Sequence, residues 1–264
     1  MGDKQMEKCI LCGCLYAGSE IVKKIYQKGY FGDIIIFTYN KEGNGQLIEF
    51  AKERGIKCFF DNINNHHRFV EQFAPDYLFS IYYRDIISKD ILDNVKKKSI
   101  NLHPSLLPKH KGCFSAPWAI LDGDEYAGIT YHEMREKVDA GNILLQRKIK
   151  IENIDTGFSL YNKLVKIGID SFDEMFQKIV IEKEDGIEQK EVGSFHYRKV
   201  PFEGKIDLNW NLEFIDRFIR ALYFPPYTGA VLDYLGKNYE FQDINSFIRF
   251  CKANKISLKG EEYS

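Results

Sequence analysis

Long hydrophobic runs are missing from this sequence. No stretch approaches the ~20 consecutive apolar residues that a membrane-spanning helix needs, and the charged N-terminus lacks the apolar core and cleavage site of a secretory signal. The sequence also has almost no excess charge, because 37 Lys and Arg stand against 38 Asp and Glu. We therefore expect no membrane association, no sequence-independent binding to nucleic acid, and a cytoplasmic location.

Cysteine and proline are also sparse, with 6 and 7 among 264 residues. This pattern does not indicate a disulfide framework in a chain of this length. Cys9 and Cys12 have C-x-x-C spacing, but no second pair or nearby His cluster accompanies them. Buried strand thiols are therefore expected rather than a zinc site, and no metal is predicted. The hydrophobic fraction of 44% is sufficient for a globular core.

Short β-branched and aromatic runs alternate with helical patterns in the first part of the chain. Strands are predicted at 8–16, 33–40, 57–60, 75–83 and 98–104, and helices at 18–29, 45–55, 65–73 and 87–95. Uninterrupted apolar strands alternating with helices indicate a parallel sheet covered on both faces. Two later strands, 128–134 and 142–151, share a short loop that suggests an antiparallel addition. The expected fold class is α/β, a doubly wound, mostly parallel Rossmann-like sheet with a small C-terminal α+β extension.

The second part of the chain predicts a long helix over about 156–182, followed by the charged stretch EKEDGIEQKE. This stretch is predicted to mark a boundary. We expect a main domain over residues 1–184, and a small C-terminal domain over residues 185–264 that binds substrate, forms a dimer, or does both.

The first strand-to-helix turn, CGCLYAGSE, invites comparison with dinucleotide-binding turns. It contains Gly13 and Gly18 but does not match G-x-G-x-x-G, and no acidic residue follows the second strand. NAD binding is therefore disfavoured. Anion binding to exposed amides near Ser19 remains open.

The segment INLHPSLLPKHKG places Asn101 and His103 two positions apart at the end of a predicted strand. Such side chains point to the same face, at the sheet edge where doubly wound folds bind ligands. An amide that holds a developing oxyanion beside an imidazole that assists proton movement suits acyl transfer to an amine. A capped strand end is the alternative. Asp139, in KVDAGNI, could orient His103, and His132 could brace its loop.

The segment NLHPSLLPKHKG, followed by ITYHEMREKVDAGNILLQ, resembles the 10-formyltetrahydrofolate-dependent formyltransferases. The resemblance covers about residues 1–180 and implies a catalytic trio of Asn101, His103 and Asp139. It implies 10-formyltetrahydrofolate as co-substrate, with its pterin ring against two loops. These loops contain Tyr83, Arg84, Asp85, Ile86 and Ile87, and Lys137 and Val138. The sequence departs from the family at Ser88, where a proline is usual.

The tail VPFEGKIDLNWNLEFIDRFIRALYFPPYTGAVL is similar to that of sugar N-formyltransferases, especially those that act on GDP-perosamine. That sugar is a 4-amino-4,6-dideoxymannose, and its N-formyl form is used in O-antigen assembly of lipopolysaccharide. The alternative acceptor is a dTDP-linked 3- or 4-amino-dideoxyglucose or -galactose. The short tail and balanced charge disfavour a tRNA acceptor, and glycinamide ribonucleotide enzymes would leave residues 185–264 unexplained. A homodimer is expected, because the tail offers apolar surface.

The contacts to the nucleotide sugar are predicted from residue type and position. The candidates are Tyr16, Ser19, Ser105, Lys109, Lys111, Phe114 and Tyr223. The lysines could bind the diphosphate or form a solvated turn, and the two later aromatic residues could stack on a base or sugar or simply pack. Two rival functions remain: a hydrolase that deformylates the folate with water, and a nucleotide-binding regulatory protein without chemistry.

Overall fold

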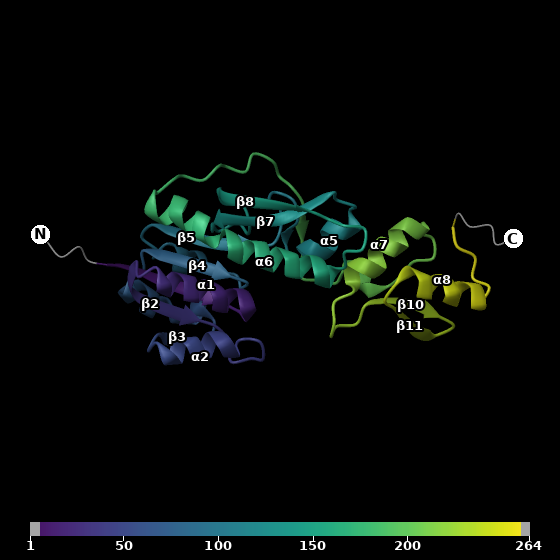
Figure 1. The fold of residues 1–264 in the computed structure, drawn as a ribbon, viewed down its shortest axis with the longest axis horizontal. Helices are drawn as coiled ribbons and strands as arrows, with labels where there is room; N and C mark the ends of the chain where they lie inside the picture. The colour runs from purple at the N-terminus through teal and green to yellow at the C-terminus, as the bar shows by residue number, and fades with distance from the viewer. Residues whose placement is uncertain (1–5, 260–264) are drawn as a thin grey trace, which may run out of the picture. The chain divides into compact units, whose positions relative to one another are not determined.

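The computed structural model describes residues 6–259, which Figure 1 draws by element. They form two compact units. The first contains the chain up to Pro108 together with Ile129–Arg147 and Val165–Val192, and the second contains Lys109–Gly128, Lys148–Leu164 and the chain from Gly193 onward. This grouping differs from the continuous division at residue 184 expected from the sequence. Local composition marks a change along the chain, whereas a compact unit is defined by contacts between distant segments.

A seven-stranded sheet is the centre of the first unit, in the order β3-β2-β1-β4-β5-β7-β8. The strands are β1 Glu7–Gly13, β2 Phe31–Phe37, β3 Lys57–Phe59, β4 Tyr77–Ile81, β5 Lys98–His103, β7 Tyr126–Glu133 and β8 Ile143–Lys150. The first five pair in parallel, and β5 pairs antiparallel with β7. The predicted doubly wound α/β sheet with an antiparallel addition is thereby confirmed.

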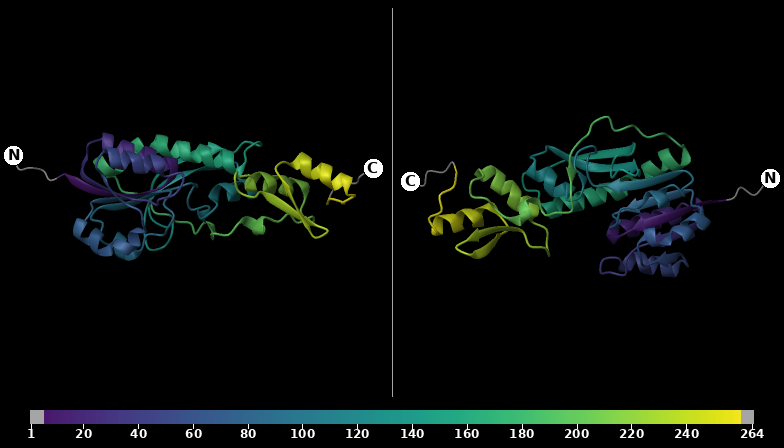
Figure 2. Two further views of the ribbon diagram at one scale, coloured as in Figure 1. Left: turned by 90° about the horizontal axis from the view of Figure 1, so that it is seen from below. Right: turned by 180° about the vertical axis from the view of Figure 1, so that it is seen from behind.

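Helices cover both faces of this sheet. They are α1 Leu15–Gln27, α2 Gly45–Glu53, η1 Ile63–His66, α3 His67–Phe73, α4 Lys89–Leu92, α6 Gly157–Met175 and the π-helical turn η2 Phe176–Ile181. Figure 2 shows α1 and α6 on one face and α3 on the other. The ring of Phe172 in α6 lies 6.0 Å from that of Phe79 in β4. Among the described helices, none has the length and apolar character required to cross a membrane.

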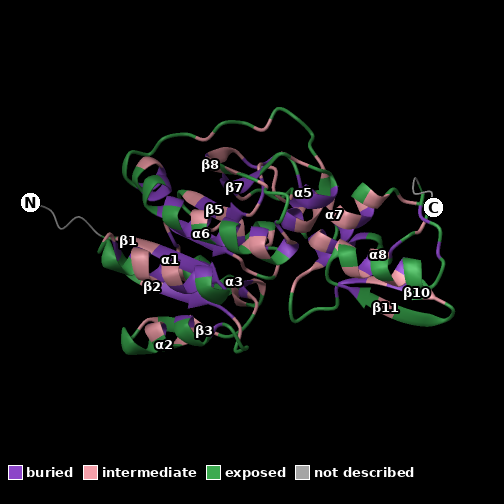
Figure 3. Ribbon diagram, turned by 45° about the vertical axis from the view of Figure 1, so that its right-hand side comes forward, coloured by how far each residue is buried: buried purple, intermediate pink, exposed green. Residues whose placement is uncertain are grey.

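Strand alternation divides the core between the two faces, because successive residues point in opposite directions. Ile10 and Cys12 of β1 join Val70 of α3 in one buried cluster, and Cys9 lies three positions from Cys12, on the other face. Both thiols are fully buried, and burial raises the pKa of each. The prediction of buried strand thiols is confirmed, and Figure 3 shows the buried centre of the sheet.

The second unit combines short strands with helices and includes the start of α6. Its elements are β6 Lys111–Gly112, α5 Ser115–Leu121, β9 Phe195–His196, η3 Pro201–Gly204, α7 Leu212–Leu222, β10 Ala230–Tyr234, β11 Lys237–Phe241 and α8 Ile244–Ala253. The side-chain oxygen of Asn211 caps α7 by accepting from the Phe214 amide at 2.8 Å. The sequence pattern did not predict α5, because it is short and carries Pro117, which a helix tolerates only in its first turn.

Candidate active site

Asn101, His103 and Asp139 converge in the first unit. Asn101 and His103 lie at the carboxyl end of β5, and Asp139 lies in the loop between β7 and β8. The Nδ1 atom of His103 is 3.5 Å from Oδ2 of Asp139. The other carboxylate oxygen is 3.3 Å from Nε2 of His132, and the same nitrogen is 3.0 Å from Nδ2 of Asn101. Nε2 of His132 therefore lies close to both the amide and the carboxylate.

The position of His132 follows from the pairing of the two strands. Asn101 and His132 are direct partners across the antiparallel β5–β7 ladder, so their side chains emerge side by side. The Nδ1 atom of His132 is 2.8 Å from the carbonyl oxygen of Glu133. A carbonyl only accepts, so Nδ1 carries the hydrogen, and Nε2 of the neutral ring accepts from the Asn101 amide. The amide nitrogen carries a second hydrogen that it can donate to a substrate oxygen.

The loop that carries Asp139 is held by close backbone contacts. Asp139 has a φ of 51°, a left-handed conformation that Asp tolerates better than most residues. The side-chain nitrogen of Gln189 donates to the carbonyl oxygens of Asp139 at 2.9 Å and Gly141 at 2.7 Å. A Cβ at Gly141 would lie 2.0 Å from the carbonyl oxygen of Glu133. The Asp-x-Gly pattern therefore meets a steric requirement of this loop.

Burial strengthens the interactions within the cluster. His103 is 5% exposed and His132 is 1% exposed, and the Asp139 side chain is 9% exposed. Charges interact more strongly where water is largely excluded. The Asp139 carboxylate only accepts, so a neutral His103 that faces it carries its hydrogen on Nδ1. Nε2 is then the basic nitrogen of that ring, and the cluster offers an amide donor, a base and an acid.

The first of the two loops predicted to contact the pterin ring of the formyl donor follows β4, and side-chain contacts anchor it. The Tyr83 ring stacks on Tyr39 with centroids 5.4 Å apart, and Asp85 accepts a hydrogen bond from the Tyr39 hydroxyl. Burial and this carboxylate raise the pKa of Tyr39 to about 12. Ile87 is buried in the core, whereas Arg84 and Ile86 are exposed. Contacts with the rest of the unit therefore hold this loop in place, while two of its side chains remain accessible to a ligand.

The second predicted donor loop follows β7. Lys137 is exposed, and Val138 is half-buried just before Asp139. Lys137 lines a cavity of about 470 Å³ together with Lys89 of α4, Lys98 of β5 and Glu133 of β7. Glu133 pairs with Lys98 at 2.9 Å. The charged groups around this cavity carry both signs.

The predicted substrate contacts fall in both units. In the first unit, Tyr16 is 57% exposed, whereas Ser19 and Ser105 are buried at 1% and 3%. In the second unit, Lys109 pairs with Asp124 at 2.9 Å, Lys111 is buried in β6, and Phe114 is 38% exposed. Tyr223, also in the second unit, lines a cavity of about 250 Å³ with Pro225 and Pro226. Because Ser19 is buried, its hydroxyl is not on the surface that α1 presents to solvent.

Sequence reasoning missed Gln189, and it gave His132 only a bracing role. Gln189 lies 50 positions after Asp139 in the charged stretch taken as a boundary. No local pattern marks it, because its role depends on an isolated bridge that pairs Ile187 with Ile143. The signal for His132 is its opposite-strand pairing with Asn101, which becomes visible only when the register is known.

Comparisons with known proteins identify the family to which this chain belongs. Residues 45–173 match the family described as formyl transferase. GDP-perosamine N-formyltransferase of Brucella melitensis is 39% identical over 186 residues, which cover 70% of this chain and 71% of that protein.

Two solved structures share the fold. A 4-N formyltransferase from Francisella tularensis has a TM-score of 0.77 at 19% identity, covering 90% of this chain and 97% of that one. An N-formyltransferase from Helicobacter canadensis, in complex with folinic acid and dTDP-3-aminofucose, has a TM-score of 0.71 at 21% identity, covering 90% and 87%. With the 39% identity across most of the Brucella protein, these findings establish that the chain belongs to the formyl transferase family.

Proposed function

We propose that this protein moves a formyl group from 10-formyltetrahydrofolate to the amine of a nucleotide-linked amino-dideoxy sugar. The observation that carries the proposal is the cluster of Asn101, His103 and Asp139, joined through His132 within hydrogen-bonding and ion-pairing distance. Such a cluster combines an oxyanion donor with a base and its orienting acid. These groups are what transfer of an acyl group to an amine requires.

The sugar amine must reach the site uncharged, because an ammonium has no lone pair. The amine attacks the formyl carbon, and negative charge builds on the formyl oxygen. Asn101 donates a hydrogen bond to this oxygen through its second amide hydrogen, while its first amide hydrogen stays hydrogen-bonded to His132. Holding the amide in place before the reaction avoids reorganisation as the charge develops.

His103 and Asp139 manage the proton that the amine loses. With its hydrogen on Nδ1 facing Asp139, His103 presents Nε2 as the group that accepts the amine proton or faces the developing charge. The carboxylate stabilises the imidazolium that forms. The bond between the formyl carbon and N10 of the folate then breaks, and the imidazolium returns the proton to N10 as tetrahydrofolate leaves. The other carboxylate oxygen lies 3.3 Å from Nε2 of the buried His132, so the His132 ring packs against the carboxylate and limits its movement.

The donor is placed by the two loops expected to contact the pterin ring. The loop Tyr83–Ile87 is held in place by its packing and can serve as a rigid support for the ring. Lys137 and Val138 of the other loop lie directly before Asp139. We expect main-chain groups to make the contacts, so the substitution of the family's proline by Ser88 should have little effect. The Helicobacter structure, solved with folinic acid, supports a folate co-substrate.

GDP-perosamine is the acceptor that we favour, with a role in O-antigen synthesis. Two observations support it: the tail sequence, and the 39% identity to the Brucella GDP-perosamine N-formyltransferase. A dTDP-linked 3- or 4-amino sugar is the second candidate, since the Helicobacter structure contains dTDP-3-aminofucose. Exposed Tyr16, Lys109 and Phe114 and the cavity-lining Tyr223 remain proposed contacts. A cytoplasmic location and a homodimer belong to the same proposal.

The proposal is tested by incubating the full chain with 10-formyltetrahydrofolate and, in separate reactions, GDP-perosamine, dTDP-3-amino and dTDP-4-amino sugars, or no sugar. Mass spectrometry of the sugar and absorbance of the folate are followed together. We expect one formyl group to be added to GDP-perosamine, and the His103→Ala variant to be inactive. Formylation of a dTDP sugar instead would change the acceptor but retain the reaction.

Two results would contradict the proposed reaction. Equal folate consumption with and without any sugar would indicate a hydrolase. Binding of a nucleotide sugar without consumption of folate or gain of mass would indicate a binding protein without chemistry.

A further inference from the structure

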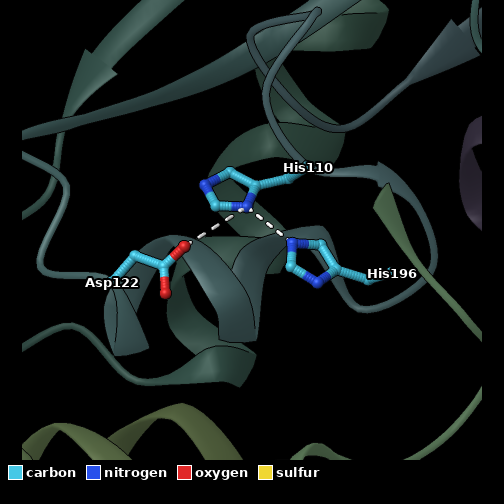
Figure 4. A group of neighbouring side chains, drawn as sticks. All are labelled: His110, Asp122 and His196. Atoms are coloured by element: carbon cyan, nitrogen blue, oxygen red, sulfur yellow. Dashed lines mark hydrogen bonds and ion pairs between the residues drawn. The ribbon is translucent and has the colours of Figure 1, made fainter. Parts of the chain in front are cut away.

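A second cluster of titratable side chains lies in the second unit and contains none of the residues assigned to formyl transfer. His110, Asp122 and His196 each offer one ligand atom, and these atoms lie within 4.8 Å of one another. Figure 4 shows the two imidazoles and the carboxylate turned toward a common point. Nδ1 of His110 is 3.0 Å from Nε2 of His196 and 3.9 Å from Oδ2 of Asp122.

A fourth residue orients His110. Its Nε2 atom is 2.9 Å from Oδ2 of Asp124, whose side chain is 14% exposed. Asp124 also pairs with Lys109, so it is a carboxylate that only accepts. The hydrogen of a neutral His110 therefore lies on Nε2, and the lone pair of Nδ1 points toward His196 and Asp122. A histidine that donates one ring N–H to a carboxylate while its other nitrogen binds metal is a recurrent arrangement in metal sites.

His196 is also held in position. Its ring stacks on Trp118 with centroids 4.3 Å apart and planes inclined by 10°. Its strand, β9, pairs in parallel with β6, and its carbonyl oxygen accepts from the Cys113 amide at 2.9 Å. The strand pairing fixes the backbone of His196, and its ring cannot turn away from His110 without losing the stack on Trp118. Two ligand nitrogens are preorganised.

We propose that His110, His196 and Asp122 bind a divalent transition metal ion of the zinc class, with Asp124 as the residue that positions His110. Zinc takes histidine nitrogens and carboxylate oxygens at about 2.0–2.2 Å, so tetrahedral ligands are about 3.3 Å apart. The measured 3.0 and 3.9 Å bracket that separation. The Asp122 side chain is 49% exposed, so it can turn inward and leave room for water as a fourth ligand.

The bound ion would have a structural role in the second unit. It would join three segments: His196 in β9, Asp122 directly after α5, and His110. His110 and His196 are 86 positions apart in the chain. Strands β6 and β9 contain two residues each. Two-residue strands supply little stability by themselves, so a metal that joins them would hold residues 194–196 in place.

The competing explanation is a hydrogen bond between the two imidazoles without metal. A separation of 3.0 Å also fits His196 donating from Nε2 to Nδ1 of His110. The two explanations differ in the part played by Asp122: a metal site needs its carboxylate, whereas the imidazole pair does not. They also differ in what a metal titration measures.

The test begins with the full chain from which bound metal has been removed by a chelator. Zn²⁺ is then titrated in and followed by calorimetry, and in a separate titration Co²⁺ is followed by its visible absorption. The variants are His196→Phe, which keeps a ring against Trp118, Asp122→Ala and Asp124→Asn. His67→Phe replaces an exposed histidine of the first unit as a matched control. His103→Ala tests whether the ion binds instead at the cluster of His103, His132 and Asp139.

We expect one ion per chain in the wild type, in His67→Phe and in His103→Ala. Binding should be lost in His196→Phe, and should be weaker by about 10–100-fold in Asp124→Asn, as is usual when a residue that orients a metal ligand is replaced. Asp122→Ala should also bind more weakly, and because Asp122 is exposed this variant should fold normally. The proposal is overturned if the wild type binds no better than His196→Phe, or if His103→Ala abolishes binding.

Discussion

At the scale of single residues, the cluster around His132 explains why an amide, two imidazoles and a carboxylate are needed together. The Glu133 carbonyl fixes the hydrogen of His132 on Nδ1, so Nε2 of His132 accepts from Asn101, and the same ring lies against the Asp139 carboxylate at 3.3 Å. Buried polar groups are costly unless they are paired. The network pairs them and still leaves Asn101 with a hydrogen to donate.

Replacement of Asn101 by Ala should remove the oxyanion donor. We expect kcat to fall by about 10²–10³-fold, the usual loss for one such donor, with a much smaller change in KM because the ground state gains little from it. Steady-state kinetics of sugar formylation measures both. Asn162→Ala, on the exposed face of α6, is the matched control and should be unaffected. An unchanged kcat in Asn101→Ala would remove this residue from the mechanism.

A double-mutant cycle should show that Asp139 and His132 act as one unit. Asp139→Asn keeps a residue that tolerates the left-handed conformation but removes the charge. We expect Asp139→Asn and His132→Phe each to lower kcat by about 10²-fold or more. The double variant should lose much less than the product of the two effects, because contacting residues are not additive. Fully multiplicative losses would show that the residues act independently.

At the scale of elements, the start of α6 depends on a buried acid in the second unit. Oδ2 of Asp155 accepts from the Glu152 amide at 2.9 Å, and Oδ1 accepts from the Ser159 hydroxyl at 2.8 Å and pairs with Lys163 at 2.7 Å. Burial opposes ionisation of Asp155, but these partners outweigh it and lower its pKa. Arg220 of α7 donates to the Asp155 carbonyl oxygen at 2.9 Å, which agrees with the structural role expected for this arginine.

Asp155→Asn should therefore destabilise the protein in a pH-dependent way. A folded-state pKa below the unfolded value gives stability that is present above the usual carboxyl pKa of about 4 and is lost as the pH falls below it. We expect a loss of about 2 kcal/mol at neutral pH, as for hydrogen bonds to a charged group, and a smaller difference from wild type in acid. Urea unfolding at several pH values measures this.

The control for this prediction is Asp170→Asn. Asp170 pairs with Lys166 on the exposed face of the same helix, where ion pairs contribute little. This variant should match the wild type at every pH. A pH-independent loss in Asp155→Asn would show that shape, rather than charge, determines the effect.

At the scale of the whole molecule, we expect a homodimer. Large apolar side chains are exposed in the C-terminal part of the chain, including Tyr197, Tyr227 and Leu235 at 79%, 73% and 83%. We expect a partner to cover these side chains where they form a contiguous apolar patch. Light scattering after size exclusion should give twice the chain mass of 30.8 kDa. A mass of one chain at all micromolar concentrations would contradict the expectation.

The amount that could be predicted from the sequence depends on the range of the interactions. The alternation of strands and helices was visible because apolar periodicity is a local property. Asn101 and His103 could be placed on one face because that requires only two-residue spacing on a strand. The hairpin β10–β11 and helix α8 were not separated within the aromatic tail, because Leu235 stands before Gly236 in the turn, where Asn, Asp or Gly is usual.

The sequence by itself determined the doubly wound sheet, the position of the amide and imidazole at a strand end, and the burial of Cys9 and Cys12. Only the tertiary structure decided that His132 joins Asn101 to Asp139, and that His110 meets His196. The first set depends on residues that are neighbours along the chain. The second depends on strand register and on segments up to 86 positions apart, and only the packing of the folded chain sets those distances.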